Sequence, residues 1–80
     1  MKYGTKLRVM RLVRGLRQSE VEERAGIPYT YLSRFESGLM LPSPEMDALI
    51  RKALNWPENA ESAFAILEGQ NGNEQMEATA

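Results

Sequence analysis

The stretch QSEVEERAGIPYTYLSRFESG, residues 18–38, decides the fold of this chain. It contains two short helical segments, and only Gly26 and Ile27 separate them, because Pro28 can open the second helix. Such a short gap forces a sharp corner, which turns apolar side chains of both helices toward one small core: Val21, Ala25, Ile27, Leu32 and Phe35. Two helices joined by a turn of about three or four residues that contains glycine form a helix-turn-helix unit, although other compact bundles contain such corners too.

Outside this stretch, glycine and proline divide the chain into further short helices, and no strand pattern is evident. Gly15 and Gly38 stand where a left-handed residue commonly ends a helix. Ser43 followed by Pro44 is a strong start signal, with the serine as N-cap and the proline in the first turn. The predicted helices cover residues 5–14, 18–25, 28–37, 44–54 and 57–68.

The last of these helices should bury one face, since its apolar residues recur at helical spacing: Ala60, Ala63, Phe64 and Leu67. From Gly69 onward the chain is polar, contains glycines and has almost no apolar residue, so residues 69–80 are predicted to be a disordered tail. A chain of 80 residues has the size of one small domain, which we expect to span residues 1–68.

Composition narrows the chemistry, because the chain contains no cysteine and no histidine. It therefore lacks disulfides, thiolate metal ligands and an imidazole base. We expect no enzyme activity, no catalytic residue, no cofactor and no metal site. Its apolar runs are far shorter than the roughly 20 residues that span a bilayer, so we expect a soluble intracellular protein without a membrane partner.

The charge is unevenly distributed along the chain, although the net charge is only −1. Residues 1–17 contain six basic residues and no acidic one, whereas residues 18–80 contain four basic and eleven acidic residues. A basic end beside an acidic remainder can direct a polyanion to one face, although a solvated basic helix would show the same pattern.

Residues 7–56 resemble the Cro/Xre-type helix-turn-helix domain of phage repressors and related bacterial regulators. The resemblance rests on elements that recur in order: an arginine in the first helix, GLRQ opening the second, glycine and an aliphatic residue at the corner, YLSRFESG, and PS before the fourth helix. It implies an all-α, compact five-helix, lambda-repressor-like fold with its third helix in the DNA major groove. It also implies a cytoplasmic protein of prokaryotic or phage origin that binds double-stranded DNA as a homodimer.

The resemblance places base reading on the outward side chains of the third helix: Tyr29, Thr30, Ser33 and Arg34. Arg34 is expected to bond guanine O6 and N7, and Thr30 can offer its methyl group to thymine or its hydroxyl to a base. The Tyr29 ring could touch a thymine methyl group, or its hydroxyl could bond a phosphate.

Phosphate binding is expected at the start of the second helix, where free N–H groups attract anions. Gln18 is similar to a family glutamine that bonds phosphate. Arg17 stands where the family usually has a Ser or Thr cap. The helix dipole disfavours a cation at this position unless the cation binds a phosphate. We therefore predict that Arg14, Arg17 and Gln18 together bind one DNA phosphate, as a clamp. After the third helix, Ser37, Ser43 and backbone N–H groups are expected to bind phosphate.

Arg11 has the charge of a DNA contact, but the resemblance implies that it pairs with Glu36 inside the domain and ties the first helix to the third. Tyr31, Leu32 and Phe35 are likewise expected in the core or at its edge.

Two features depart from the family pattern. Glu22 stands where a small residue is usual, so we expect its carboxylate to lean into solvent or to pair with a basic residue. The loop Leu39–Met40–Leu41 is apolar and is expected either to fold onto the core or to form a self-association surface. Further apolar stripes on the first and fifth helices could cover each other or meet a second copy: Val9, Leu12 and Val13, and Phe64, Ile66 and Leu67.

The function predicted from these features is a sequence-specific DNA-binding regulator, a repressor or autoregulator. The alternative is a protein-interaction module of the same fold, an antitoxin-like component or anti-repressor that binds a regulatory protein partner and reads little DNA.

Overall fold

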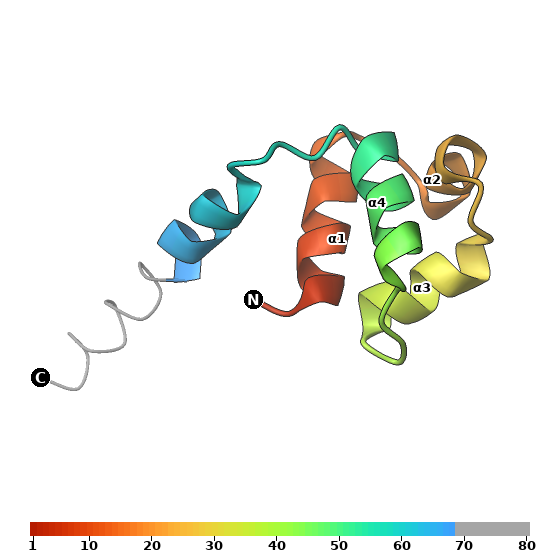
Figure 1. Cartoon of the computed structure of the whole chain (residues 1–80), viewed down its shortest axis with the longest axis horizontal. Helices are drawn as coiled ribbons and strands as arrows, with labels where there is room; N and C mark the ends of the chain where they lie inside the picture. Colours follow the sequence, from red (N-terminus) through yellow and green to blue (C-terminus); the bar gives the residue numbers. More distant parts are fainter. Residues whose placement is uncertain (69–80) are drawn as a thin grey trace, which may run out of the picture.

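The structure, a computed structural model, describes residues 1–68, and within them the chain is all-helical with no strand. The helices are α1 (Tyr3–Val13), α2 (Gln18–Ala25), α3 (Tyr29–Ser37), α4 (Pro44–Ala53) and an unlabelled fifth helix at residues 60–68. α3 packs on both α1 and α2, and α4 packs on α2. Figure 1 shows the fifth helix on the far side of α1 from α2 and α3. The predicted all-α, five-helix, lambda-repressor-like class is confirmed, whereas the predicted tail at residues 69–80 lies outside the described residues.

The helix boundaries follow the local signals with small differences. α2 has the predicted bounds, and Ser43 caps α4, since its Oγ accepts the Met46 N–H at 3.2 Å. α3 begins one residue later than predicted, because Pro28 has an extended backbone (ψ 139°) and serves as N-cap. The fifth helix begins at residue 60 after a turn, three residues later than predicted.

The core lies between the helices and includes all five apolar residues predicted to meet at the α2–α3 corner. Its buried apolar side chains are Leu7, Met10, Leu16, Val21, Ala25, Ile27, Leu32, Phe35, Ile50, Leu54, Trp56, Ala60 and Phe64. Gly26 ends α2 with a left-handed backbone (φ 73°) that side chains disfavour, and the chain turns there into α3.

α1 approaches the end of α3 closely at Gly4. A Cβ atom on Gly4 would lie 2.3 Å from the Phe35 carbonyl oxygen and 2.6 Å from that of Glu36. Only glycine fits between these two backbones, so α1 can lie directly against α3. α1 begins at Tyr3, two residues earlier than predicted.

The fifth helix is attached to the rest of the molecule by aromatic and charged contacts. The Phe64 ring lies edge-on to Trp56 with centroids 6.1 Å apart, and Lys6 Nζ binds Glu61 Oε2 at 2.5 Å. Ala60 and Phe64 are buried as predicted, but Ala63 and Leu67 are exposed, so the prediction for those two residues is wrong. The buried face of this helix is therefore narrower than predicted.

In residues 1–68, no helix is long and apolar enough to cross a membrane. In that same part of the chain, no group of three or more acidic, cysteine or histidine side chains is placed to hold a metal ion.

Candidate nucleic-acid interface

α3 divides its side chains between a buried and an exposed face. Leu32 and Phe35 are 1% and 0% exposed and fill the core. The four predicted base-reading residues are all exposed, and Tyr29 is 52% exposed: Tyr29, Thr30, Ser33 and Arg34. Tyr31, expected in the core or at its edge, is 37% exposed, and its ring lies 6.4 Å from that of Phe35. α3 therefore exposes all four predicted base-reading side chains to solvent.

The start of α3 is held by a carboxylate from α2. Glu22 Oε2 accepts the backbone N–H of Tyr29 at 2.5 Å, whereas the N-cap residue Pro28 offers no side-chain acceptor. A negative charge is favourable at a helix N-terminus, where N–H groups lack partners. The expectation that Glu22 leans into solvent or pairs with a basic residue is wrong, because the close approach of α2 and α3 brings the α3 N-terminus within its reach.

Arg11 and Glu36 form a two-point ion pair between α1 and the last turn of α3. Arg11 Nε lies 2.7 Å from Glu36 Oε2, and Nη2 lies 3.0 Å from Oε1. Arg11 Nη1 also donates to the Leu16 carbonyl oxygen at 2.8 Å. The side chains are only 13% and 7% exposed, and the hydrogen bond to Glu36 raises the pKa of Arg11. This pair holds α3 against α1.

Arg17 is the N-cap of α2, and its side chain accepts no cap hydrogen bond. The Glu20 carboxylate accepts the Arg17 backbone N–H at 3.0 Å. Among residues 1–68, the Arg17 guanidinium has no ion pair or hydrogen bond, so it leaves a free cation beside Gln18.

Arg14, the third member of the predicted clamp, lies against the end of α4. Its Nε and Nη2 donate to the carbonyl oxygens of Leu54 and Asn55 at 2.9 and 2.8 Å. These bonds satisfy carbonyl groups that a helix C-terminus leaves without partners. A phosphate contact from Arg14 therefore competes with a structural task and stays a prediction.

Ser37 and Ser43 each have a local hydrogen bond. Ser37 Oγ donates to the Arg34 carbonyl oxygen at 3.1 Å, and Ser43 caps α4. A hydroxyl group has only one donor hydrogen. Ser43 keeps that hydrogen for a phosphate oxygen, whereas Ser37 already donates its hydrogen to the Arg34 carbonyl oxygen. The phosphate role of both serines stays a prediction.

A polar hollow of about 270 Å³ joins α1, the start of α2 and the end of α3. Its lining brings together predicted site residues from all three helices with one residue that sequence reasoning missed, Arg8: Arg8, Arg11, Gln18, Ser33, Glu36 and Ser37. The spacing of Arg8 and Arg11, one helical turn apart, is the signal that could have placed Arg8 on this face.

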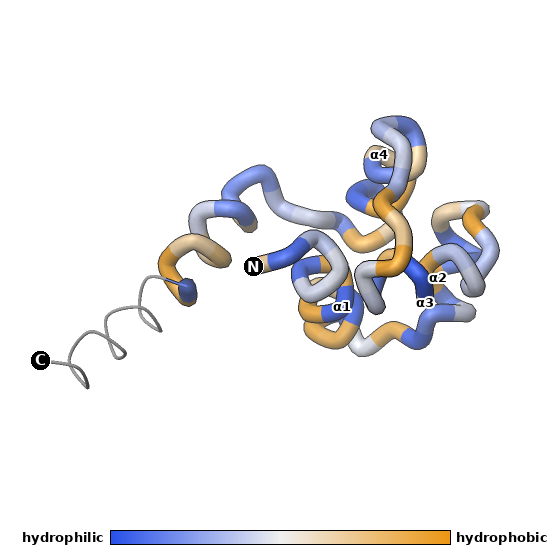
Figure 2. The backbone as a smooth tube through the Cα atoms, turned by 90° about the horizontal axis from the view of Figure 1, so that it is seen from below, coloured by the Kyte–Doolittle hydropathy of each residue, from blue (hydrophilic) through white to orange (hydrophobic). Residues whose placement is uncertain are grey.

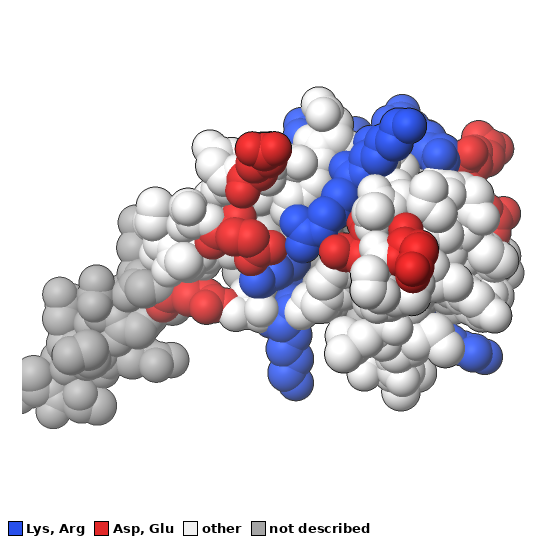
Figure 3. All heavy atoms as spheres, viewed as in Figure 1, with Lys and Arg blue, Asp and Glu red and all other residues white. Residues whose placement is uncertain are grey.

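Tertiary contacts reduce the free charge of the basic N-terminal segment. Lys6 is paired with Glu61, Arg11 with Glu36, and Arg14 with carbonyl groups. Three of its six cations have no ion pair or hydrogen bond in the described part of the chain: Lys2, Arg8 and Arg17. Figure 3 shows one face on which a row of basic side chains runs between groups of acidic ones.

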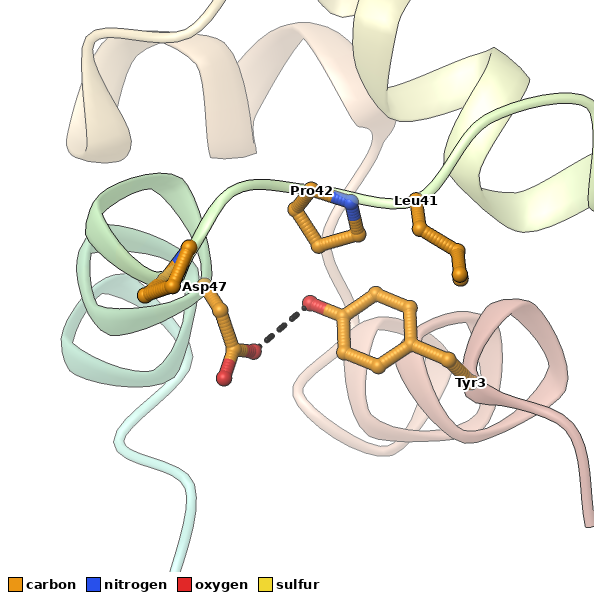
Figure 4. Close-up of a pocket in the computed structure, with 5 residues that line it drawn as sticks. Tyr3, Leu41, Pro42 and Asp47 are labelled. Carbon is orange, nitrogen blue, oxygen red and sulfur yellow. Dashed lines mark hydrogen bonds between the residues drawn. The ribbon is translucent and has the colours of Figure 1, made fainter.

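A second hollow, of about 310 Å³, lies where the α3–α4 loop passes over α1 and is lined by Tyr3, Leu41, Pro42, Pro44 and Asp47. Figure 4 shows the Tyr3 hydroxyl directed at Asp47, to whose Oδ1 it donates at 2.9 Å. Burial and this hydrogen bond raise the pKa of Tyr3. The Tyr3 hydroxyl and the Asp47 carboxylate are thus hydrogen-bonded to each other, and the other lining residues are apolar.

The loop beside this hollow is a continuous apolar stretch in Figure 2. Leu39 and Leu41 are 81% and 76% exposed. The alternative in which these leucines fold onto the core is therefore wrong.

The comparisons with known proteins agree with this geometry. The family model described as helix-turn-helix matches residues 7–58, which include α2, α3, α4 and most of α1. No curated protein matches the chain, and no solved structure does. Members of the matched family are DNA-binding regulators and are typically not enzymes. The chain belongs to the Cro/Xre-type helix-turn-helix family.

Proposed function

We propose that this protein is a sequence-specific transcriptional regulator, a repressor or autoregulator that binds as a homodimer to a two-fold-symmetric DNA operator. The observation that carries the proposal is the division of α3, whose apolar side closes the core while Tyr29, Thr30, Ser33 and Arg34 are exposed together. A helix anchored on one side and polar on the other suits the major groove, where base edges present distinct donors and acceptors.

Within this surface, Arg34 is the main candidate for reading guanine. It has no ion pair among the described residues, so its planar group is free for a bidentate bond to O6 and N7. Thr30 and Ser33 supply short polar side chains beside it. The Tyr29 backbone is held by Glu22 while its ring is exposed, which suits contact with a thymine methyl group or a phosphate.

Phosphate contacts position such a helix and give most of the sequence-independent affinity. Arg17 and Gln18 at the start of α2 suit this role best, because the Arg17 charge is free and the helix N-terminus favours an anion. Ser43 would add a neutral contact beyond α3, and Ser37, the last residue of α3, would add one by giving up its hydrogen bond to the Arg34 carbonyl oxygen.

A two-fold operator presents its half-sites about 34 Å apart and requires two copies of the chain. Three exposed apolar surfaces can supply the contact between copies. They are formed by Leu39 and Leu41 after α3, by Ile66 and Leu67 on the fifth helix, and by Leu12 and Val13 at the end of α1. Sedimentation of variants in which one of these residue pairs at a time is changed to serine distinguishes the three surfaces.

The proposal is tested by selecting binding sites from a random duplex library and footprinting the protein on them. We expect a two-fold-symmetric site, and we expect Arg34→Ala to weaken binding by about 1–3 kcal/mol and to relax specificity at one position of each half-site.

Lys52→Ala is the matched control, because Lys52 is an exposed cation on α4 with no ion pair in residues 1–68. If Arg34→Ala and Lys52→Ala weakened binding equally on every duplex sequence, Arg34 would not be a base-reading residue. A chain that binds no duplex at all would contradict the proposal.

The exposure of Leu39 and Leu41 favours a second candidate function, an antitoxin-like or anti-repressor module that binds a protein. In that case Leu39→Ser with Leu41→Ser would abolish binding of the protein partner, and Arg34→Ala would leave this binding unchanged.

A further inference from the structure

The hollow between α1, α2 and α3 contains a cation, Arg8, that has no part in the proposed base reading or in the proposed phosphate contacts of Arg17 and Gln18. Arg8 lines this hollow from α1 and is exposed. Among residues 1–68 its guanidinium has no ion pair and no hydrogen bond. Arg8 therefore supports the fold through none of the contacts that occupy Arg11 and Arg14.

The other charges in the hollow cancel. Arg11 and Glu36 bind each other through bonds of 2.7 and 3.0 Å, and the third Arg11 bond goes to a carbonyl oxygen. Arg8 consequently supplies the net positive charge of the hollow. Two neutral groups of the lining can donate hydrogen bonds, namely the Gln18 amide and the Ser33 hydroxyl, whereas the Ser37 hydroxyl already donates to the Arg34 carbonyl oxygen.

One positive charge surrounded by neutral donors matches a phosphodiester group, which carries one negative charge and two free oxygens. Arginine suits this ligand because its planar fork can bond two phosphate oxygens at once. The hollow also lies beside Ser33, on the α3 face assigned to base reading. DNA that receives α3 in its major groove would bring its backbone past this position.

We propose that the hollow holds one backbone phosphate of the bound duplex and that Arg8 neutralises it. This inference rests on the proposed DNA-binding function and adds a contact from α1 to those from α2. It assigns Arg8 to affinity and positioning, and leaves sequence discrimination to α3.

The test measures duplex binding over a series of salt concentrations for the parent, Arg8→Ala, Arg8→Lys and the control Lys52→Ala. A plot of log affinity against log salt concentration has a negative slope. We expect this slope to be less steep by about 0.9 in Arg8→Ala, the value for one phosphate contact on B-DNA. The same variant should bind selected duplexes and unrelated duplexes more weakly by the same factor. Arg8→Lys should keep the parent slope, because the charge remains.

Ethylation of individual phosphates identifies the contact directly. We expect one phosphate whose ethylation weakens DNA binding by the parent protein but not by Arg8→Ala. The thermal melt of Arg8→Ala should equal that of the parent, since the Arg8 side chain has no ion pair or hydrogen bond in the described residues.

An unchanged salt slope in Arg8→Ala, with normal duplex binding by the parent, would overturn this inference and leave the proposed function standing. A change in base preference would also overturn it, because Arg8 would then read bases. Saturable, Arg8-dependent binding of inorganic phosphate without any effect on the duplex slope would assign the hollow to a free anion instead. Failure of the parent to bind any duplex would reject the proposed function itself.

Discussion

At the scale of single residues, the arginines of α1 and its C-cap have the same charge but different roles. Arg11 is mostly buried in an ion pair, Arg14 caps the end of α4, and Arg8 is exposed without a bond in the described residues. Sequence reasoning placed Arg11 with Glu36 through the family resemblance. It could not foresee the Arg14 bonds, because Leu54 and Asn55 are about 40 residues away and meet Arg14 only after α4 has packed.

Arg11→Ala should destabilise the fold strongly. The change leaves the buried Glu36 carboxylate without its partner, and breaking a buried pair costs about 3–5 kcal/mol. Thermal melting measures the loss, and for a domain of this size each kcal/mol lowers Tm by about 4–8 °C. Arg8→Ala, one turn earlier on the same helix, is the control that should melt like the parent. A parent-like melt for Arg11→Ala would show that the pair contributes little.

At the scale of elements, α3 is positioned by α1 and α2 and not by its own sequence alone. Gly4 lets α1 approach the last turn of α3, and Glu22 from α2 caps its first turn. Neither contact is evident from local signals. A glycine near the start of a helix predicts weak helix propensity, and a carboxylate in the middle of α2 predicts an exposed side chain.

Glu22→Ala should therefore destabilise the chain by about 1 kcal/mol, the usual worth of an N-terminal cap. The Tyr29 amide should exchange its hydrogen faster, since it loses its acceptor. Glu22→Gln keeps an acceptor oxygen but loses the charge, so its effect should lie between those of the parent and the alanine variant. Urea unfolding and amide exchange measure these changes.

The neighbouring Glu23 provides the control, because it is exposed and has no hydrogen bond among the described residues. Glu23→Ala should leave both measurements unchanged. Equal exchange of the Tyr29 amide in the parent and in Glu22→Ala would contradict the capping role.

At the scale of the whole molecule, the fifth helix is held to α1 and α4 through Glu61. This carboxylate binds Lys6 at 2.5 Å and lies 3.6 Å from Arg51, whose guanidinium carbon lies 4.7 Å from the Trp56 ring centre. The hydrogen bond from Lys6, followed by the charges of Lys6 and Arg51, lowers the pKa of Glu61 below its ordinary value of 4.5.

Acid should loosen this attachment. Because the pKa of Glu61 is lower in the folded state, its stabilising effect is complete above pH 4.5 and is lost as the pH falls through the folded pKa. The effect should stay below about 1 kcal/mol, since the pair is partly exposed. Fluorescence of Trp56, the single tryptophan, should show a step in this acid range that Glu61→Gln lacks.

Glu58→Gln serves as the control, because Glu58 is exposed and has no ion pair in residues 1–68, so this variant should keep the step. An identical acid step in Glu61→Gln would mean that another group controls the attachment.

The sequence by itself determined the helices, the corner and the division of α3 into a core side and an outer side. Those features depend on signals within a few residues of one another, such as a glycine after a helix, a serine before one and apolar residues at helical spacing. Only the tertiary structure decided which charges are free. Glu22, Arg14 and Lys6 each have partners on another helix, and the charge of a side chain does not indicate which partner lies within hydrogen-bonding distance until the helices have packed.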